Sequence, residues 1–160
     1  MPEVFIGAGS NADPERRLKF ALHELERRFG RVRCSNVYRS AAVGARAADY
    51  SNLVLALTTA RSVDHVRNEL REIEALAGRS RADAAVCELD LDLLLYGSRV
   101  DAQRKLPRPK LLAAPFVVIP LAELAPELPH PVTGELPADA AAAVDGNDLT
   151  RDVWSVANEE

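Results

Sequence analysis

Two segments with helical periodicity lie between apolar, strand-like segments, and this order constrains the fold more than any other feature of the sequence. Apolar residues at spacings of four, three and four predict the first helix, and they are Leu18, Leu22, Leu25 and Phe29. The same kind of periodicity predicts a second helix over residues 62–77. Short apolar runs bounded by glycine or polar residues predict strands at 4–10, 32–40, 52–60 and 88–97.

The expected helix ends carry residues that are typical of such positions. Asp13 is expected to cap the first helix, with Pro14 at its first position, where the missing N–H of proline costs no hydrogen bond. Gly30 is expected to end this helix. Ser62 is expected to cap the second helix and Gly78 to end it.

The resulting order, β-α-β-β-α-β, is that of the ferredoxin-like arrangement. We therefore predict an α+β fold with a ferredoxin-like βαββαβ core, an antiparallel sheet covered by helices on one side, and a C-terminal helical appendage. The length suits a single domain over residues 1–160. From about residue 138 the tail is alanine-rich with one short helical stretch, and we expect it to be loosely ordered in part.

Composition and charge argue against several classes of protein. A net charge of −4 disfavours a nucleic-acid interface based on bulk positive charge, and 5% aromatic residues offer little for stacking RNA bases. No run of about 18 apolar residues is present, so we expect no membrane span and no membrane partner. Two cysteines and no signal peptide predict a cytoplasmic protein without a disulfide framework, and we expect a monomer or weak dimer.

The segment "ELDLDLLLYG" (88–97) places two carboxylates inside an apolar strand. Residues i and i+2 of a strand point to the same face, so Asp90 and Asp92 share a face, with Glu88 at its edge and the alternate leucines toward the helices. Two carboxylates on one strand suit one or two Mg²⁺ ions that keep waters for substrate phosphates. The alternative is a solvated sheet face that merely alternates polar and apolar residues.

Other side chains near this strand also have two interpretations each. Arg79 and Arg81 precede it, and arginine binds phosphate well, but Arg79 is equally suited to neutralise the end of the second helix. Tyr50 and Asn52 lie where a loop enters a strand, which suits a flat aromatic ligand with amide-type hydrogen bonds. A tyrosine at such a position also commonly belongs to the core.

Five groups of motifs, taken in order, resemble one family. They are "FIGAGSN", "VYRSAAVG" with "DYSN", "IEALAGRSR", "ELDLDLLLYG" and "APFVVIPLAELAPEL". Over about residues 4–128 the chain is similar to the 6-hydroxymethyl-7,8-dihydropterin pyrophosphokinases of folate biosynthesis. The resemblance implies a diphosphokinase that transfers diphosphate from ATP to the hydroxymethyl group of a reduced pterin, with ATP as co-substrate and two Mg²⁺ ions as cofactor.

The resemblance also implies roles for individual residues. Asp90 and Asp92 are expected to be catalytic and to hold Mg²⁺. The nucleotide side is expected to comprise Glu74, the catalytic Arg79 and Arg81, and Arg108. Asn52 would hydrogen-bond the edge of the pterin and Phe116 would stack on its ring; the whole expected pterin pocket is Ser40, Val43, Tyr50, Asn52 and Phe116.

The chain departs from the family pattern mainly on the nucleotide side. The segment before the acidic strand is slightly short and lacks a tryptophan, and Cys87 stands where the family has an arginine. Pro107 is followed by Arg108 instead of histidine, and Ala114 replaces another arginine. Such losses would slow turnover by about 10³-fold or more unless Arg108, Arg104 or Lys110 supplies the charge. The alternative is a catalytically impaired or repurposed paralogue that binds a pterin or nucleotide without efficient transfer.

Overall fold

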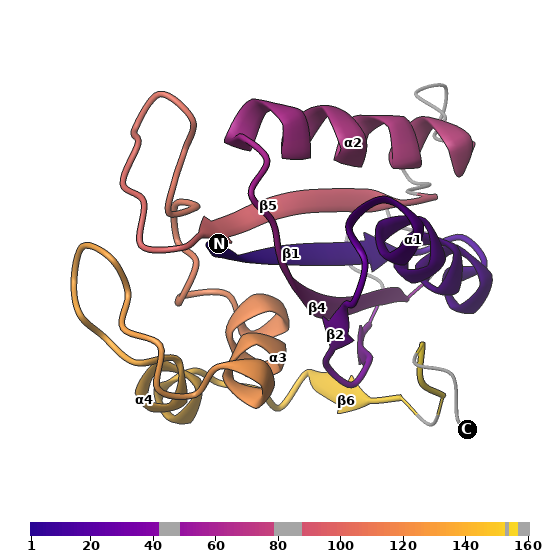
Figure 1. Cartoon of the computed structure of the whole chain (residues 1–160). Coiled ribbons are helices and arrows are strands. Elements are labelled where there is room, and N and C mark those ends of the chain that lie inside the picture. Colours follow the sequence, from indigo (N-terminus) through magenta and orange to yellow (C-terminus); the bar gives the residue numbers. More distant parts are fainter. Residues whose placement is uncertain (42–48, 79–87, 153, 157–160) are drawn as a thin grey trace.

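The computed structural model describes residues 1–41, 49–78, 88–152 and 154–156, and Figure 1 shows their arrangement. The first part of the chain forms β1 (Glu3–Ser10), α1 (Pro14–Phe29), β2 (Arg33–Cys34), β3 (Tyr38–Ser40), β4 (Tyr50–Thr58), α2 (Val63–Leu76) and β5 (Asp90–Tyr96). The remainder forms α3 (Pro115–Leu124), α4 (Pro137–Ala143) and β6 (Leu149–Arg151). Four residues of the sequence-based hypotheses lie outside the described part: Val43, Arg79, Arg81 and Cys87.

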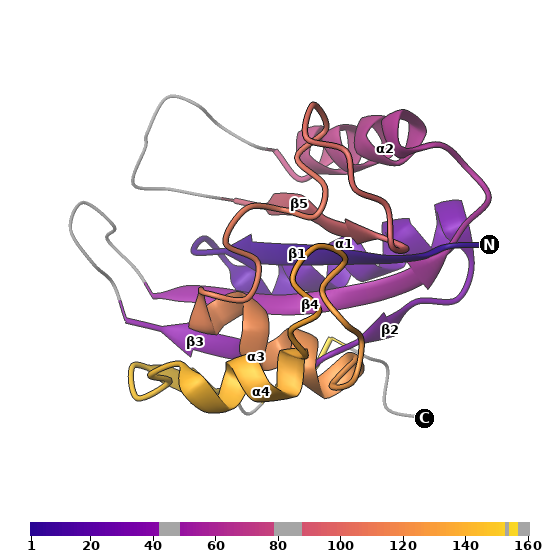
Figure 2. The same cartoon turned by 90° about the vertical axis from the view of Figure 1, so that its left-hand side faces the viewer.

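The described strands form one antiparallel sheet in the order β5-β1-β4-β3-β6, with β2 also pairing with β4. This topology confirms the predicted α+β, ferredoxin-like core. Helices α1 and α2 cover one face of the sheet, whereas α3 lies on the opposite face with α4 beside it (Figures 1 and 2). The sheet is therefore covered by two helices on one side and partly covered on the other, and the partly covered face holds the candidate site.

Two apolar clusters lie on the two faces of the sheet. Apolar residues of α1, α2, β1, β4 and β5 form the larger cluster, which includes Leu91 and Leu93. The smaller cluster lies under α3 and includes Leu94 and Leu95. A register shift in the β1–β5 pairing puts Leu94 and Leu95 on the same side, because Ile6 pairs with Leu93 and Phe5 with Leu95. The strict alternation that places the two aspartates thus ends at Leu94.

The helix ends agree with the sequence analysis. Ser62 caps α2 as predicted, because its Oγ accepts a hydrogen bond from the backbone N–H of His65 at 3.1 Å. Gly30 ends α1, with its N–H donating to the Glu26 carbonyl at 2.9 Å. Asp13 is the N-cap residue of α1 as predicted, but its side chain accepts no helix N–H: the residue has φ +48° and its carboxylate pairs with Arg16 at 2.8 Å.

The segment predicted as one strand over 32–40 is two short strands, because side chains replace strand partners between them. The hydroxyl of Ser35 accepts a hydrogen bond from the backbone N–H of Val54 at 2.9 Å. The carboxylate of Glu123 on α3 accepts from both the backbone and side-chain nitrogens of Asn36, at 3.0 and 2.9 Å. Glu123 also accepts from the Tyr38 hydroxyl, and burial, followed by this contact, raises the pKa of Tyr38 to about 12. These contacts fix α3 above the sheet.

The C-terminal part contributes both a helix and a strand. The short helix expected there is α4. Strand β6 was not predicted, and it pairs with β3 along Tyr38–Ser40, where the Asp152 N–H donates to the Val37 carbonyl at 2.8 Å. A three-residue strand carries too little pattern to be recognised from sequence. Among the described residues, no helix is long and apolar enough to cross a lipid bilayer.

Helix α2 is held against α1 by an ion-pair network. Arg28 of α1 contacts Glu69 of α2 and pairs with Glu72 at 2.7 Å. Glu24 lies 3.5 Å from the same guanidinium group, and its hydrogen bond to Arg27 lowers the pKa of Glu24 more than any other single contact. The Arg28 side chain is mostly buried, and its ion pairs connect α2 to α1.

Candidate active site

One row of residues across the sheet relates the acidic strand to the rest of the site. Asp90 of β5 pairs with Gly9 of β1, Gly9 pairs with Asn52 of β4, and Asn52 pairs with Tyr38 of β3. Paired residues in neighbouring strands present their side chains on the same face. Asp90 and Asn52 therefore share the face below α3. Strand β1 lies between their strands, so two strand spacings separate them by about 9.5 Å.

Gly9 is required in this row because of the close approach of two side chains. A Cβ atom at this position would lie 2.4 Å from a ring carbon of Tyr50 and 2.7 Å from the side-chain oxygen of Asn52. Gly7, one row along, pairs with Asp92 and with Val54, where it likewise leaves the sheet surface open. The two glycines make a side-chain-free strip of sheet between the carboxylates and β4.

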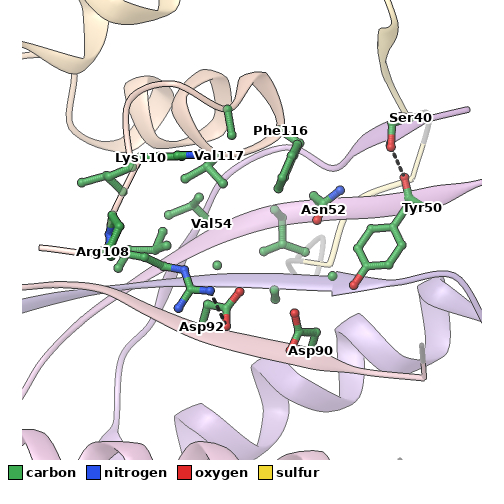
Figure 3. Close-up of a pocket in the computed structure, with 18 residues that line it drawn as sticks. Ser40, Tyr50, Asn52, Val54, Asp90, Asp92, Arg108, Lys110, Phe116 and Val117 are labelled. Carbon is green, nitrogen blue, oxygen red and sulfur yellow. Dashed lines mark hydrogen bonds and ion pairs between the residues drawn. The ribbon is translucent and has the colours of Figure 1, made fainter. Parts of the chain in front are cut away.

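This strip is the floor of a cavity of about 610 Å³ between the sheet and α3 (Figure 3). Its walls include four of the five residues expected around a pterin, namely Ser40, Tyr50, Asn52 and Phe116. The Phe116 ring extends from the first turn of α3 toward the sheet beside Asn52, and the residue is 46% exposed (Figure 3). Asp90 and Asp92 line the other side of the cavity. The cavity has the size and mixed lining of a small-molecule site.

A second cavity, of about 290 Å³, lies between α2 and β5, and Asp90 and Asp92 line it too. Glu74 of α2 also lines it and accepts a hydrogen bond from the Leu91 N–H at 3.0 Å, which joins the helix to the acidic strand. Three arginines also line it: Arg67, Arg71 and Arg108. The second cavity is thus strongly polar, in contrast to the first, and the two cavities meet at the aspartate pair.

Three basic residues were candidates to supply the charge that the family places elsewhere, and they differ in which cavity they line: Arg108, Lys110 and Arg104. Arg108 lies 3.5 Å from Asp92 and lines both cavities, and its backbone N–H donates to the Leu94 carbonyl at 2.9 Å, which fixes it beside β5. Lys110 lines the larger cavity (Figure 3). Arg104 instead pairs with Asp64 and Asp101 at 3.0 Å, and these contacts raise its pKa further. Arg104 lines neither cavity.

The donor set at the junction of the cavities fits magnesium. Asp90 and Asp92 supply two hard carboxylates, and within the described ranges no three or more His, Cys, Asp or Glu side chains are arranged so that they could hold a metal ion by themselves. Mg²⁺ is usually held by one or two carboxylates together with waters and substrate phosphates. A pair of carboxylates beside an arginine-lined cavity meets this requirement, so Asp90 and Asp92 are the residues that would hold the ion.

Comparison with known proteins identifies the family. A family model described as 7,8-dihydro-6-hydroxymethylpterin-pyrophosphokinase (HPPK) matches residues 5–126. The chain belongs to the HPPK family. A 2-amino-4-hydroxy-6-hydroxymethyldihydropteridine pyrophosphokinase of Synechocystis sp. is 36% identical over 95% of this chain and 79% of the relative. Proteins of the same name from Pseudomonas aeruginosa and Aquifex aeolicus are 36% and 31% identical, over 87% and 82% of this chain and 90% and 86% of those relatives.

Solved structures of HPPK proteins share the fold. The HPPK-DHPS protein crystallised in complex with substrates superposes with a TM-score of 0.76 at 9% identity, over 94% of this chain. A second structure, of Plasmodium falciparum HPPK-DHPS with pteroate, has a TM-score of 0.72 at 10% identity, also over 94% of this chain. This chain spans 46% of each of those longer chains, and at such low identity the likeness concerns the fold alone.

The sequence analysis missed two side chains of the site. Arg67 and Arg71 were not considered, although their spacing of four places them on one side of the predicted helix. Glu74, three residues further, shares that side and was considered. The helical spacing together with Glu74 was the signal that could have identified both arginines. Of the expected HPPK site residues, Val43, Arg79 and Arg81 lie outside the described part of the chain.

Proposed function

We propose that this chain catalyses transfer of diphosphate from ATP to the hydroxymethyl group of 6-hydroxymethyl-7,8-dihydropterin. The hydroxymethyl oxygen bonds to the β-phosphorus, the bond from that phosphorus to the oxygen on the α-phosphorus breaks, and AMP leaves. The hydroxyl proton is released to water. The observation that carries the proposal is that Asp90 and Asp92 line both cavities, so ligands in the two cavities would meet at the carboxylates.

The larger cavity suits the pterin. Asn52 is 8% exposed and offers both a donor and an acceptor to the edge of a flat heterocycle. Phe116 lies on the α3 side with its ring directed toward the sheet, where it can stack on the same heterocycle (Figure 3). A pterin held between these residues would direct its hydroxymethyl group toward the strand that carries Asp90 and Asp92.

The smaller cavity suits the phosphates of ATP. Its arginines offer planar, charged donors that match phosphate oxygens. Mg²⁺ bound between Asp90, Asp92 and the phosphates would neutralise charge on the transferred group. Arg108 lies beside Asp92. It would contact the phosphates from the side of β5 that faces away from α2. The proposal thus gives the chain's residues the tasks of binding and orienting two substrates.

Simultaneous binding of the two ligands tests this assignment of the cavities. In calorimetric titrations with Mg²⁺, we expect one equivalent of α,β-methylene-ATP to bind, and then one equivalent of 6-hydroxymethylpterin to bind to the nucleotide complex. Chelating Mg²⁺ should weaken nucleotide binding and leave a pterin site. Displacement of the pterin by the nucleotide analogue would mean that both occupy one cavity, which would refute the two-site arrangement.

A further inference from the structure

Three guanidinium groups line the smaller cavity, those of Arg67, Arg71 and Arg108. Arg71 is exposed and hydrogen-bonds Asn68 at 3.2 Å, and Arg67 donates to the backbone carbonyl of Arg104. Neither contact involves a carboxylate, in contrast to Arg28 and Arg104, which pair with acidic side chains. Arg108 forms an ion pair with Asp92 at 3.5 Å.

The position of the arginines follows from the geometry of α2. Arg67, Arg71 and Glu74 are spaced i, i+4 and i+7, so they lie on one side of the helix. The bond from the Leu91 N–H to the Glu74 carboxylate shows that this side faces β5. Arg108 approaches the same strand from the segment that precedes α3. Positive side chains therefore flank Asp90 and Asp92 from two directions.

The electrostatic environment of Arg67 also indicates a site for an anion. Burial lowers the pKa of Arg67, and the neighbouring positive charge of Arg71 lowers it further, as do Arg108 and Arg104, while Asp64 opposes the shift. A phosphate between these side chains would relieve their mutual repulsion. Arginine binds such a group through two parallel, charge-assisted hydrogen bonds.

We propose that Arg67 and Arg71 of α2 act with Arg108 as the phosphate-binding cluster of this chain, positioning the polyphosphate of a nucleoside triphosphate against Asp90 and Asp92. The proposal rests on the proposed function, because it assigns the nucleotide to the smaller cavity. It goes further in naming two residues on α2 that supply charge which the family pattern places elsewhere. The chemical class that the cluster selects is a nucleoside carrying several phosphates, not the base or the ribose.

Neutral and conservative substitutions of the two helical arginines test this role. We expect Arg71→Gln and Arg67→Gln each to weaken Mg²⁺-dependent binding of α,β-methylene-ATP about tenfold, and the double variant to weaken it more. Arg71→Lys should retain part of the affinity because it keeps the charge. The affinity for α,β-methylene-ATP should also depend less on ionic strength in the glutamine variants. Arg16→Gln, an exposed change on α1, is the matched control and should bind like the parent.

Two further ligands separate this proposal from the proposed function. Binding of 6-hydroxymethylpterin should be unchanged in every arginine variant, since Arg67 and Arg71 do not line the larger cavity. If the parent chain binds no α,β-methylene-ATP, both the proposed function and the cluster are overturned. If the parent binds it and the Arg67→Gln and Arg71→Gln variants bind equally tightly, only the cluster is overturned. An equal loss of adenosine binding would place these arginines at the base or ribose, which would also refute the cluster.

Discussion

Asp90→Asn and Asp92→Asn are each expected to lower the rate of AMP formation by about 10³-fold. Each variant loses a carboxylate that would hold Mg²⁺, and a bound metal ion stabilises the charge of the transition state by several kcal/mol, on the order of the barrier change that this factor requires. The fold should remain intact. Asp92 and Arg108 are 37% and 41% exposed, so their pair contributes only about 0–1 kcal/mol to stability. Steady-state assays and thermal unfolding of each variant, with titrations of α,β-methylene-ATP at several Mg²⁺ concentrations, measure both expectations.

The matched control for these variants is Asp139→Asn. Asp139 is exposed on α4 and lines neither cavity, so its amide variant should resemble the parent in both rate and nucleotide affinity. Unchanged Mg²⁺ dependence in both Asp90→Asn and Asp92→Asn would remove the metal site from this account. A large fall in melting temperature without a change in Mg²⁺ dependence would indicate that the carboxylates are structural.

Asn52→Ala is expected to weaken binding of 6-hydroxymethylpterin by about 1–3 kcal/mol, or roughly five- to 150-fold. The physical reason is that the donors and acceptors of the pterin ring would lose their partner, the Asn52 amide in the wall of the cavity. Titrating the intrinsic fluorescence of the pterin measures the affinity. Asn147→Ala, in an exposed turn outside both cavities, is the control. Equal pterin affinity in Asn52→Ala and the parent would show that the pterin is not bound beside Asn52.

The parts of the fold that carry a regular pattern could be predicted from the sequence. The alternation in "ELDLDLLLYG" placed Asp90 and Asp92 on one face and Leu91 and Leu93 on the other, as observed. Helical periodicity located both α1 and α2, and their order with the strands predicted the topology. The register shift at Leu94 was not predictable, because an extra residue in a run of leucines does not change the apolar pattern.

The parts that depend on tertiary contacts could not be predicted. Arg104 and Arg108 lie in the same proline-punctuated segment, and no periodicity distinguishes them. The structure distinguishes them. Asp64 and Asp101 form ion pairs with Arg104, whereas the hydrogen bond from the Arg108 N–H to the Leu94 carbonyl fixes Arg108 beside β5. Strand β6 likewise depends on pairing with a strand more than 100 residues away in sequence. These ion pairs, hydrogen bonds and strand pairings depend on residues that lie apart in the sequence, so no local pattern reveals them.

Transfer of diphosphate from ATP to the pterin is tested most directly by following the β- and γ-phosphates of ATP through the reaction. The chain is incubated with Mg²⁺, 6-hydroxymethyl-7,8-dihydropterin and ATP labelled at either the β- or the γ-phosphate. We predict that AMP forms only when the pterin is present, in equal amount to a pterin product, and that this product carries the label in both experiments. Formation of ADP with only the γ-label on the pterin, or tight binding of both substrates without any labelled pterin, would contradict it.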